Sequence, residues 1–380
     1  MADWQTKTLG EVLLKTETVN PALAPDEEFN YIDVSSVSNA TYAVEATQRL
    51  KGREAPSRAR RLVCAGDVIL ATIRPTLKRI AVVPPELDGQ VCSTGYFVLR
   101  PYSDIDHRFL FYYLFTEQFL GAMESLQKGA SYPAVTDAEV RTQPISFPRI
   151  QEQRRIVAIL DEAFECIATA KANAEKNLHN ARELYRNHVK SVFMRAAEDW
   201  PTRTLDQISM NLDSRRVPVT KSDRKAGEFP YYGASGIVDY VADYIFEGEA
   251  LLVSEDGANL LARSTPIAFP ASGRYWVNNH AHILKFDQMA TQQFVEFFLE
   301  SIPLDVYITG AAQPKLNQRA LNSIPIPIPD SVNAQVVVVD LLERVAEQTE
   351  RLRTTYERKL AALGELKRSL LHQAFSGRLS

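Results

Sequence analysis

The sequence predicts an α+β fold in which two globular domains of small mixed β-sheets with helices alternate with two long helices. Three observations support this prediction. Residues 151–197 contain no proline or glycine and have apolar residues at helical spacing. A second stretch with the same pattern lies near the C-terminus, and short motifs from the first half of the chain recur in the second. We therefore expect a pseudo-two-fold repeat of domain, helix, domain, helix.

The two long stretches have the pattern of an antiparallel coiled coil. Apolar residues recur in alternating steps of three and four, the spacing with which one helix buries a narrow seam against another. Several seam positions of the first stretch fall on seam positions of the second after a shift of 182 residues. The predicted seam residues are Ile156, Leu160, Ala163, Ile167 and Leu184 in the first helix, and Val338, Leu342, Val345, Leu352, Leu363, Leu366 and Leu370 in the second.

The repeat extends into the globular domains and gives the predicted boundaries. Trp4-Gln-Thr-Lys-Thr-Leu9 recurs as Trp200-Pro-Thr-Arg-Thr-Leu205, and Gly66-Asp-Val-Ile-Leu70 recurs as Gly248-Glu-Ala-Leu-Leu252. Gly129-Ala-Ser-Tyr-Pro133 has a looser counterpart at Gly310 to Pro314. These matches divide the chain into a first domain (1–150), a first long helix (151–198), a second domain (199–330) and a second long helix (331–380).

Each domain begins with strands and ends with a helix and a proline-rich exit. Residues 68–72 and 79–83 are short β-rich runs around Pro75, which predicts a hairpin. Residues 109–119 and 294–299 have aromatic residues at helical spacing. The prolines at 144–148 and 325–329 prevent a continuous helix from entering the long stretches.

Composition limits the class of protein. The 380 residues exceed what one hydrophobic core usually holds, and three scattered cysteines predict neither a disulfide framework nor a zinc site. No signal peptide or membrane-length apolar run is present, so we expect a cytoplasmic location without membrane contact. The net charge of −4 means that any DNA binding depends on local basic groups or on a partner.

Catalytic motifs are missing. The sequence contains no Gly-Lys dipeptide for a phosphate loop, no GxGxxG after a strand and no zinc-binding spacing of histidine or cysteine. His280 and His282 are favoured as structural or hydrogen-bonding residues, because a third metal ligand does not stand out. Gly233 to Gly236 has the wrong spacing for a nucleophile elbow. We expect the chain to catalyse nothing by itself and to bind no metal.

The loops instead contain polar and basic residues beside glycine. Such side chains can contact phosphates and base edges, although surface loops are polar in any case. These loops are candidates for DNA recognition because equivalent loops in the two halves carry different residues. Residues 51–61 add five basic side chains, and Glu255 and Asp256 add acceptors. The candidate DNA-binding residues are Arg74, Thr76, Lys78, Arg79, Lys128, Ser131 and Tyr132 in the first half, and Tyr231, Tyr232, Ser235, Asn259, Gln313 and Lys315 in the second.

Several of these motifs, in this order and duplicated, resemble the specificity subunit of a type I restriction–modification system over essentially the whole chain. They include the Trp4 start, Gln151-Glu-Gln-Arg-Arg-Ile-Val157, Tyr231-Tyr-Gly-Ala-Ser-Gly-Ile237 and the closing Leu370-Leu-His-Gln-Ala-Phe-Ser-Gly-Arg-Leu379. One departure is the start of the second long helix, Ser331-Val-Asn-Ala-Gln335, which lacks Glu-Gln and begins one residue further from its proline. Contacts with a partner at that end are therefore expected to differ.

The resemblance implies two target-recognition domains that each read one half of a bipartite double-stranded DNA site. It also implies two methyltransferase subunits that use S-adenosylmethionine, and two restriction and translocase subunits that use ATP and magnesium. This chain itself would bind no cofactor. Three alternatives stay open: an orphan specificity protein that serves only a methyltransferase, a coiled-coil spacer without a DNA role, and the reading part of a fused modification enzyme.

Overall fold

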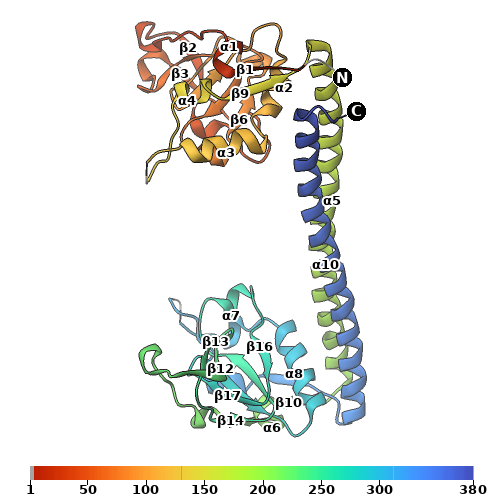
Figure 1. The fold of residues 1–380 in the computed structure, drawn as a ribbon. Helices are drawn as coiled ribbons and strands as arrows, with labels where there is room; N and C mark the ends of the chain where they lie inside the picture. The colour runs from red at the N-terminus through yellow and green to blue at the C-terminus, as the bar shows by residue number, and fades with distance from the viewer. Residues whose placement is uncertain (1–3, 130, 311, 380) are drawn as a thin grey trace. The chain divides into compact units, whose positions relative to one another are not determined.

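The computed structural model describes residues 4–129, 131–310 and 312–379, with only the backbone described for residues 196–198. Contacts divide the chain into two compact units (Figure 1): Met1–Ala174 with Lys359–Ser380, and Glu175–Arg358. Each long helix therefore belongs partly to both units. The four-segment division of the sequence stays a prediction. None of the helices in the described part of the chain is long and apolar enough to cross a membrane.

The first unit contains two small sheets, of order β3-β2-β7-β4 and β6-β5-β8, and an antiparallel pair, β1-β9. Helices α2 and α3, the start of the first long helix and the end of the second cover one face of the three-stranded sheet. A second core lies on the other face, where β5, β6 and β8 meet residues of β2 and β7. The elements are β1 (Gln5–Thr8), α1 (Leu9–Val12), β2 (Glu28–Ile32), β3 (Gln48–Lys51), β4 (Ala59–Leu62), β5 (Val68–Ala71), β6 (Ile80–Val82), β7 (Val91–Ser93), β8 (Tyr96–Leu99), α2 (His107–Tyr113), α3 (Glu117–Leu126), α4 (Asp137–Arg141) and β9 (Pro144–Phe147).

The second unit repeats this plan with sheets of order β13-β12-β17-β14 and β11-β18-β15-β16 and the pair β10-β19. Its elements are β10 (Thr202–Thr204), α6 (Leu205–Ile208), β11 (Met210–Asn211), β12 (Ala226–Gly233), β13 (Gly236–Val241), β14 (Phe246–Glu247), β15 (Ala250–Ser254), α7 (Asn259–Ala262), β16 (Ala268–Ala271), β17 (Arg274–Val277), β18 (Ala281–Lys285), α8 (Met289–Ser301), α9 (Gln318–Asn322) and β19 (Pro325–Pro327).

The same two aromatic contacts recur in each unit, and one of them joins the domain to a long helix. In the first unit Phe109 lies 6.3 Å from Trp4 and 4.7 Å from Phe375, measured between ring centroids. In the second unit Phe294 lies 5.7 Å from Trp200 and 5.2 Å from Phe193. Such tilted ring pairs bury large apolar surfaces in a defined geometry. The predicted fold class, α+β with two related domains and two long helices, is confirmed.

The long helices are α5 (Ile150–Asp199) and α10 (Val332–Phe375), and they run antiparallel within each unit (Figure 1). In the first unit the start of α5 packs with the end of α10, for example Ile156 and Leu160 with Leu371. In the second unit the end of α5 packs with the start of α10, where Val189 joins the cluster of Leu342 and Val338. Ile167 is also buried, and the partly buried seam residues are Ala163, Val345, Leu363 and Leu370.

Three predicted seam residues point to solvent instead. The exposed fractions are 71 % for Leu184, 46 % for Leu352 and 47 % for Leu366. The correction has a geometric cause, because an α-helix has 3.6 residues per turn and cannot keep an exact alternation of three and four without supercoiling or an extra step of four. After Ala174 the less exposed positions of α5 are Leu178, Ala181 and Tyr185, which rotates Leu184 outward.

The register of the repeat also differs by one residue in the central strand. The sequence match pairs Leu70 with Leu252, but Leu70 faces the helix-covered core whereas Leu252 faces the other core. Val253 occupies the position that corresponds to Leu70, in the helix-covered core of its own unit. Because side chains alternate between the two faces of a strand, a one-residue shift is needed to keep each face in its core.

Candidate nucleic-acid interface

In the first domain the turn between β5 and β6 is tied to a glycine-containing loop, residues 128–134. The turn contains two left-handed residues, Arg74 and Lys78, on either side of a short 3₁₀ segment that begins at Pro75. Its backbone joins the loop through two hydrogen bonds, from Arg74 N to Pro133 O (2.6 Å) and from Val135 N to Thr72 O (2.9 Å). We call this paired turn and loop the first reading tip.

The first reading tip brings together several of the predicted residues. The Arg74 guanidinium donates to the Ser131 carbonyl oxygen (3.1 Å) and lies 5.1 Å from the centre of the Tyr132 ring. Tyr132 has an exposed fraction of 72 %, and Thr76 and Ser131 are exposed as well. A guanidinium stacked on an exposed aromatic ring is a preformed surface for base edges or phosphate.

Other basic residues of the first domain are already engaged. Arg79 donates to the carbonyl oxygens of Val34 and Val37 (2.9 and 3.1 Å), so it closes a loop. Lys128 pairs with Glu139 at 2.9 Å, and this hydrogen bond is the main reason that the pKa of Glu139 falls to about 2. Lys78 is partly buried. Within the basic run 51–61, Arg53 and Arg61 form ion pairs with carboxylates.

The second domain builds the same backbone arrangement with different side chains. Gly257 N donates to Pro314 O (3.0 Å), and Leu316 N donates to Glu255 O (2.8 Å). These bonds match the two in the first domain, so Gly257 takes the place of Arg74 and Gln313 that of Tyr132. We call the turn at 255–257 with the loop 309–315 the second reading tip. Gln313 and Lys315 are exposed there, and Ser235 lies in an exposed turn beside the end of β15.

Three predicted residues of the second domain have structural roles. Tyr231 has an exposed fraction of 1 %, and its hydroxyl donates to the Val219 carbonyl oxygen, so it cannot contact DNA directly. Tyr232 packs against the rings of Phe269 and Tyr275. The Asn259 side chain bonds both the N–H and the carbonyl of Thr265, which closes its turn. The two tyrosines therefore pack in the domain, and the asparagine stabilises a turn.

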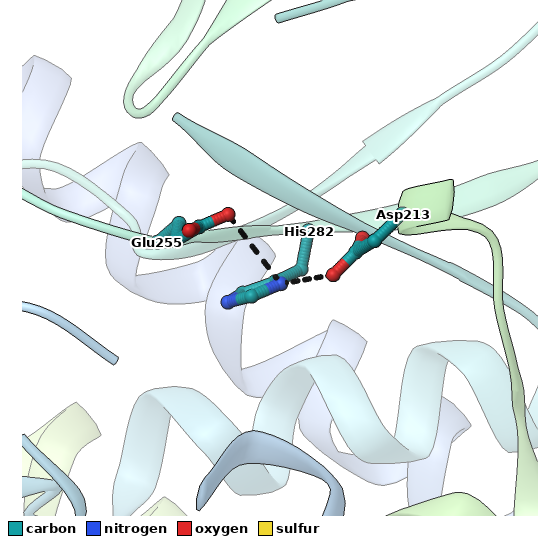
Figure 2. A group of neighbouring side chains, drawn as sticks. All are labelled: Asp213, Glu255 and His282. Atoms are coloured by element: carbon teal, nitrogen blue, oxygen red, sulfur yellow. Dashed lines mark hydrogen bonds and ion pairs between the residues drawn. The ribbon is translucent and has the colours of Figure 1, made fainter. Parts of the chain in front are cut away.

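A buried charge cluster lies beneath the second reading tip, and Figure 2 shows the Asp213 and Glu255 carboxylates pointing toward the His282 ring. The His282 Nδ1–H donates to Asp213 (2.5 Å), and its Nε2–H donates to the Leu316 carbonyl oxygen (2.7 Å). Arg216 pairs with Glu255 at 2.6 Å, and Lys315 pairs with the same carboxylate at 3.1 Å.

The three side chains have the spacing of a three-ligand metal site, but their ligand atoms are already bonded to other groups of the protein. The ligand atoms of Asp213, Glu255 and His282 lie within 4.8 Å of one another. Both ring nitrogens of His282 are already bonded to oxygen, and the carboxylates already accept from Arg216 and Lys315, so these cations stand where a metal ion would. The donor set therefore fits a hydrogen-bonded ion network.

The pKa values of the two carboxyl groups follow from this network. Burial alone would raise the pKa of Asp213, but the hydrogen bond and positive charge of His282 outweigh burial and hold it below its usual value. Glu255 behaves in the same way, since Arg216, His282 and Lys315 together outweigh its burial. Asp213 and Arg216 could not be identified from sequence pattern, because they lie far along the chain from His282.

The start of each long helix is held by a buried glutamine. Gln153 donates to the Pro148 carbonyl oxygen (2.8 Å), and Gln335 donates to the Pro329 carbonyl oxygen (2.8 Å). Both side chains are buried, with exposed fractions of 0 % and 5 %. The second helix lacks the Glu-Gln pair in sequence, but Gln335 reproduces this contact across the extra residue.

Comparison with known proteins places these features in one family. A family model described as the type I restriction modification DNA specificity domain matches residues 1–178 and 197–360. The chain is 34 % identical over 147 residues to a putative type I restriction enzyme specificity subunit of Haemophilus influenzae, covering 39 % of this chain and 37 % of that protein. It is 26 % identical over 149 residues to the EcoDI specificity subunit of Escherichia coli, covering 38 % and 32 %.

Two solved structures align with this chain over essentially its full length. The crystal structure of the HsdS subunit from Thermoanaerobacter tengcongensis aligns with a TM-score of 0.70 at 26 % identity, covering 99 % of this chain and 97 % of that one. A chain from a study of complex assembly and conformational transition of the type I R-M system aligns with a TM-score of 0.88 at 25 % identity, covering 100 % of both. The sequence matches span only about a third of the curated relatives, 37 % and 32 % of their lengths. The chain belongs to the type I restriction modification DNA specificity domain family.

Proposed function

We propose that this protein is the DNA-sequence-recognition subunit of a type I restriction–modification complex and is not itself catalytic. Each globular domain reads one half of a bipartite site on double-stranded DNA. The long helices set the separation between the half-sites and bind the methyltransferase subunits. The main support is that one backbone arrangement, repeated in the two reading tips, presents Arg74 and Tyr132 in one domain and Gln313 and Lys315 in the other.

Different side chains on the same backbone suit two different half-sites. Arginine pairs best with the O6 and N7 of guanine in the major groove, and glutamine pairs with the N6 and N7 of adenine. Each good contact of this kind discriminates by about 1–3 kcal/mol, so a few in each domain suffice for a short half-site. Other exposed candidates, among them Thr76, Ser131 and Ser235, then serve as supplementary contacts.

The partners follow from the same role. Two methyltransferase subunits would supply S-adenosylmethionine chemistry, and two restriction and translocase subunits would supply ATP- and magnesium-dependent cleavage. All three cofactors would be bound by those subunits. The complex would act on chromosomal and invading DNA in the cytoplasm.

Expression of the chain with its methyltransferase subunits tests this proposal. Sequencing of the methylated DNA should reveal one bipartite motif with methylation in both halves, and a gel shift should require both kinds of subunit and that motif. Methylation without sequence preference, or no binding at all, would favour the coiled-coil spacer. A host that methylates the motif but never restricts unmethylated DNA would favour an orphan subunit that serves only a methyltransferase.

A further inference from the structure

The second reading tip depends on one buried side chain in a way that the first does not. His282 lies on β18 with an exposed fraction of 0 %, and its Nε2–H donates to the carbonyl oxygen of Leu316, directly after loop 309–315. The amide of the same residue, Leu316, donates to Glu255 O at 2.8 Å. The Leu316 carbonyl is thus held by a side chain of the cluster drawn in Figure 2, whereas the Leu316 amide makes the same backbone bond that Val135 makes in the first domain.

The cluster also reaches the side chains of the tip. Glu255 accepts from Lys315 (3.1 Å), which is itself an exposed residue of the loop, and from Arg216 (2.6 Å). The neighbouring Asp256 pairs with His280 at 2.9 Å and forms a backbone bridge with Lys315. A line of ion pairs therefore runs from buried Asp213 through His282, which lies 3.8 Å from Glu255, to the exposed Lys315. The hydrogen bonds from His282 to Asp213 and from Lys315 to Glu255 are charge-assisted and therefore stronger than neutral ones.

The first domain holds its tip differently. Strand pairing places Phe97 opposite Leu70, and His282 opposite Val253, so Phe97 occupies the position of His282. An apolar ring cannot donate to a carbonyl. Loop 128–134 is held instead by exposed contacts, from Arg74 to the Ser131 carbonyl oxygen and from Lys128 to Glu139. The two tips share a backbone but not a means of support.

We propose that His282 is a positioning residue for the second half-site: it fixes loop 309–315 to the sheet, so that Gln313 and Lys315 meet DNA in a set geometry. This inference rests on the proposed function only where it concerns DNA. The positioning itself is a property of the free chain. Pre-organisation of this kind affects discrimination because a loop that is already ordered loses less entropy on binding.

Two substitutions at His282 test the positioning directly. His282→Phe copies the residue of the first domain and removes both ring hydrogen bonds, whereas His282→Gln keeps an amide donor for the Leu316 carbonyl oxygen. Hydrogen exchange is measured in the full chain at the amides of Thr309, Lys315 and Leu316. We expect His282→Phe to speed exchange there roughly tenfold or more, since a hydrogen bond that involves a charged group is lost. His282→Gln should stay closer to the original chain.

Three internal references make the result specific. The amides of Lys128, Ala134 and Val135 form the equivalent bonds in the first domain and should not change. The strand amides of β15 and β18 should keep their protection. Asp239→Asn, which breaks the 3.2 Å pair with Arg224 elsewhere in the second domain, should leave the loop unaffected. Unchanged exchange in His282→Phe, or equal loss of protection in β15, β18 and the loop, would overturn the proposal.

DNA discrimination separates this inference from the function on which it draws. With methyltransferase subunits present, His282→Phe should reduce the preference for the correct second half-site by about tenfold, with the first half-site read as before. His282→Gln should restore most of that preference. A loosened loop with unchanged reading of both half-sites would retain the positioning but contradict the assignment of this loop to DNA reading. A rigid loop with altered reading would overturn the positioning.

Discussion

The corner where each domain meets the long helices carries different charged groups in the two units, although the backbone is repeated. In the first unit the Lys367 ammonium lies 5.2 Å from the Tyr42 ring and 4.8 Å from the Phe164 ring, beside a cavity of about 530 Å³ that Phe111 and Phe115 also line. Lys367 lies eight residues before Phe375, and Tyr185 lies eight residues before the equivalent Phe193. Tyr185 therefore takes the place of Lys367 in the second unit.

At the same corner of the second unit, two carboxyl groups replace two phenylalanine rings of the first. Phe111 and Phe115 follow Phe109 by two and six residues, and Glu296 and Glu300 follow the equivalent Phe294 by the same steps. The two glutamates line a cavity of about 780 Å³ together with Tyr185. Burial, then Glu300 and Glu343, raise the pKa of Glu296 to about 7. Burial, followed by Lys171 and Lys78, lowers the pKa of Lys367. The comparison teaches that the aromatic contacts carry the fold, while the positions between them are free to diverge.

The largest expected effect concerns those shared aromatic contacts. Phe193→Ala should destabilise the second unit by roughly 3–5 kcal/mol, because Phe193 has an exposed fraction of 3 % and truncation leaves a cavity. Phe375→Ala should cost less in the first unit, since Phe375 is only partly buried. Urea unfolding measures both, followed by fluorescence in chains that keep only Trp4 or only Trp200 of the three tryptophans. Equal losses would show that the two corners do not differ in packing.

The next effect separates the two reading tips. Arg74→Ala should weaken discrimination at the first half-site by about 1–3 kcal/mol and leave the second unchanged, because the guanidinium belongs to one tip only. Competition binding with each half-site altered in turn provides the measurement. Arg79→Ala is not a suitable control, because Arg79 supports a loop. Arg49→Ala serves as the control, since Arg49 is a basic residue that pairs with Glu28. A loss spread over both half-sites would contradict separate reading.

A smaller effect tests the buried Glu296 carboxyl group through pH. The pKa of Glu296 is about 7 in the folded chain and near 4.5 in the unfolded chain, so the folded state binds more protons between these values. Stability should therefore fall as pH rises from about 4.5 to 7, and Glu296→Gln should remove that component. At pH 8 this variant should be more stable by about 1–2 kcal/mol.

Thermal unfolding at pH 5 and pH 8 measures that difference. Lys367→Met provides the opposite case in the first unit. A lysine with a lowered pKa costs stability while it is protonated in the fold, so the gain from its removal is present at neutral pH and fades as pH rises toward the unfolded value. A Glu296→Gln gain that is equal at both pH values would contradict the assigned charge burial.

The smallest expected effect concerns the corrected helix seam. Leu184→Gln should change stability by no more than about 0.5 kcal/mol, because the side chain is largely exposed. Leu160→Ala at a buried seam position should cost about 2–5 kcal/mol in the same denaturation assay. A large loss from Leu184→Gln would restore the original assignment of the seam.

Much of the fold could be predicted because its signals are periodic or repeated. The long helical stretches, the tryptophan starts and the glycine loops each recur, and recurrence predicts domain order without any knowledge of packing. The exact seam could not be predicted at Leu184, Leu352 and Leu366, since a stripe of leucines permits several alternations of three and four. The strand register failed by one residue for a similar reason, because Leu251, Leu252 and Val253 are all apolar.

The sequence indicates which candidate residues are close neighbours along the chain, but it does not indicate their distant partners. Arg74 could be placed at a hairpin tip from Pro75 alone, but its approach to Ser131 and Tyr132 depends on the long-range bond to Pro133. Tyr231, Tyr232 and Asn259 have the side-chain chemistry of DNA contacts, and only burial shows that they pack or close turns. The His282 cluster joins residues that lie about 30 to 70 positions apart, a separation that leaves no local pattern.

Exchange of one recognition domain tests the central claim most directly. Residues 1–150 are replaced by the corresponding segment of a relative with a different site, and the methylated motif is sequenced after expression with the methyltransferase subunits. Two independent readers predict that one half of the motif changes while the other half and the gap between them stay as they were. A motif altered in both halves, or in neither, would contradict the account.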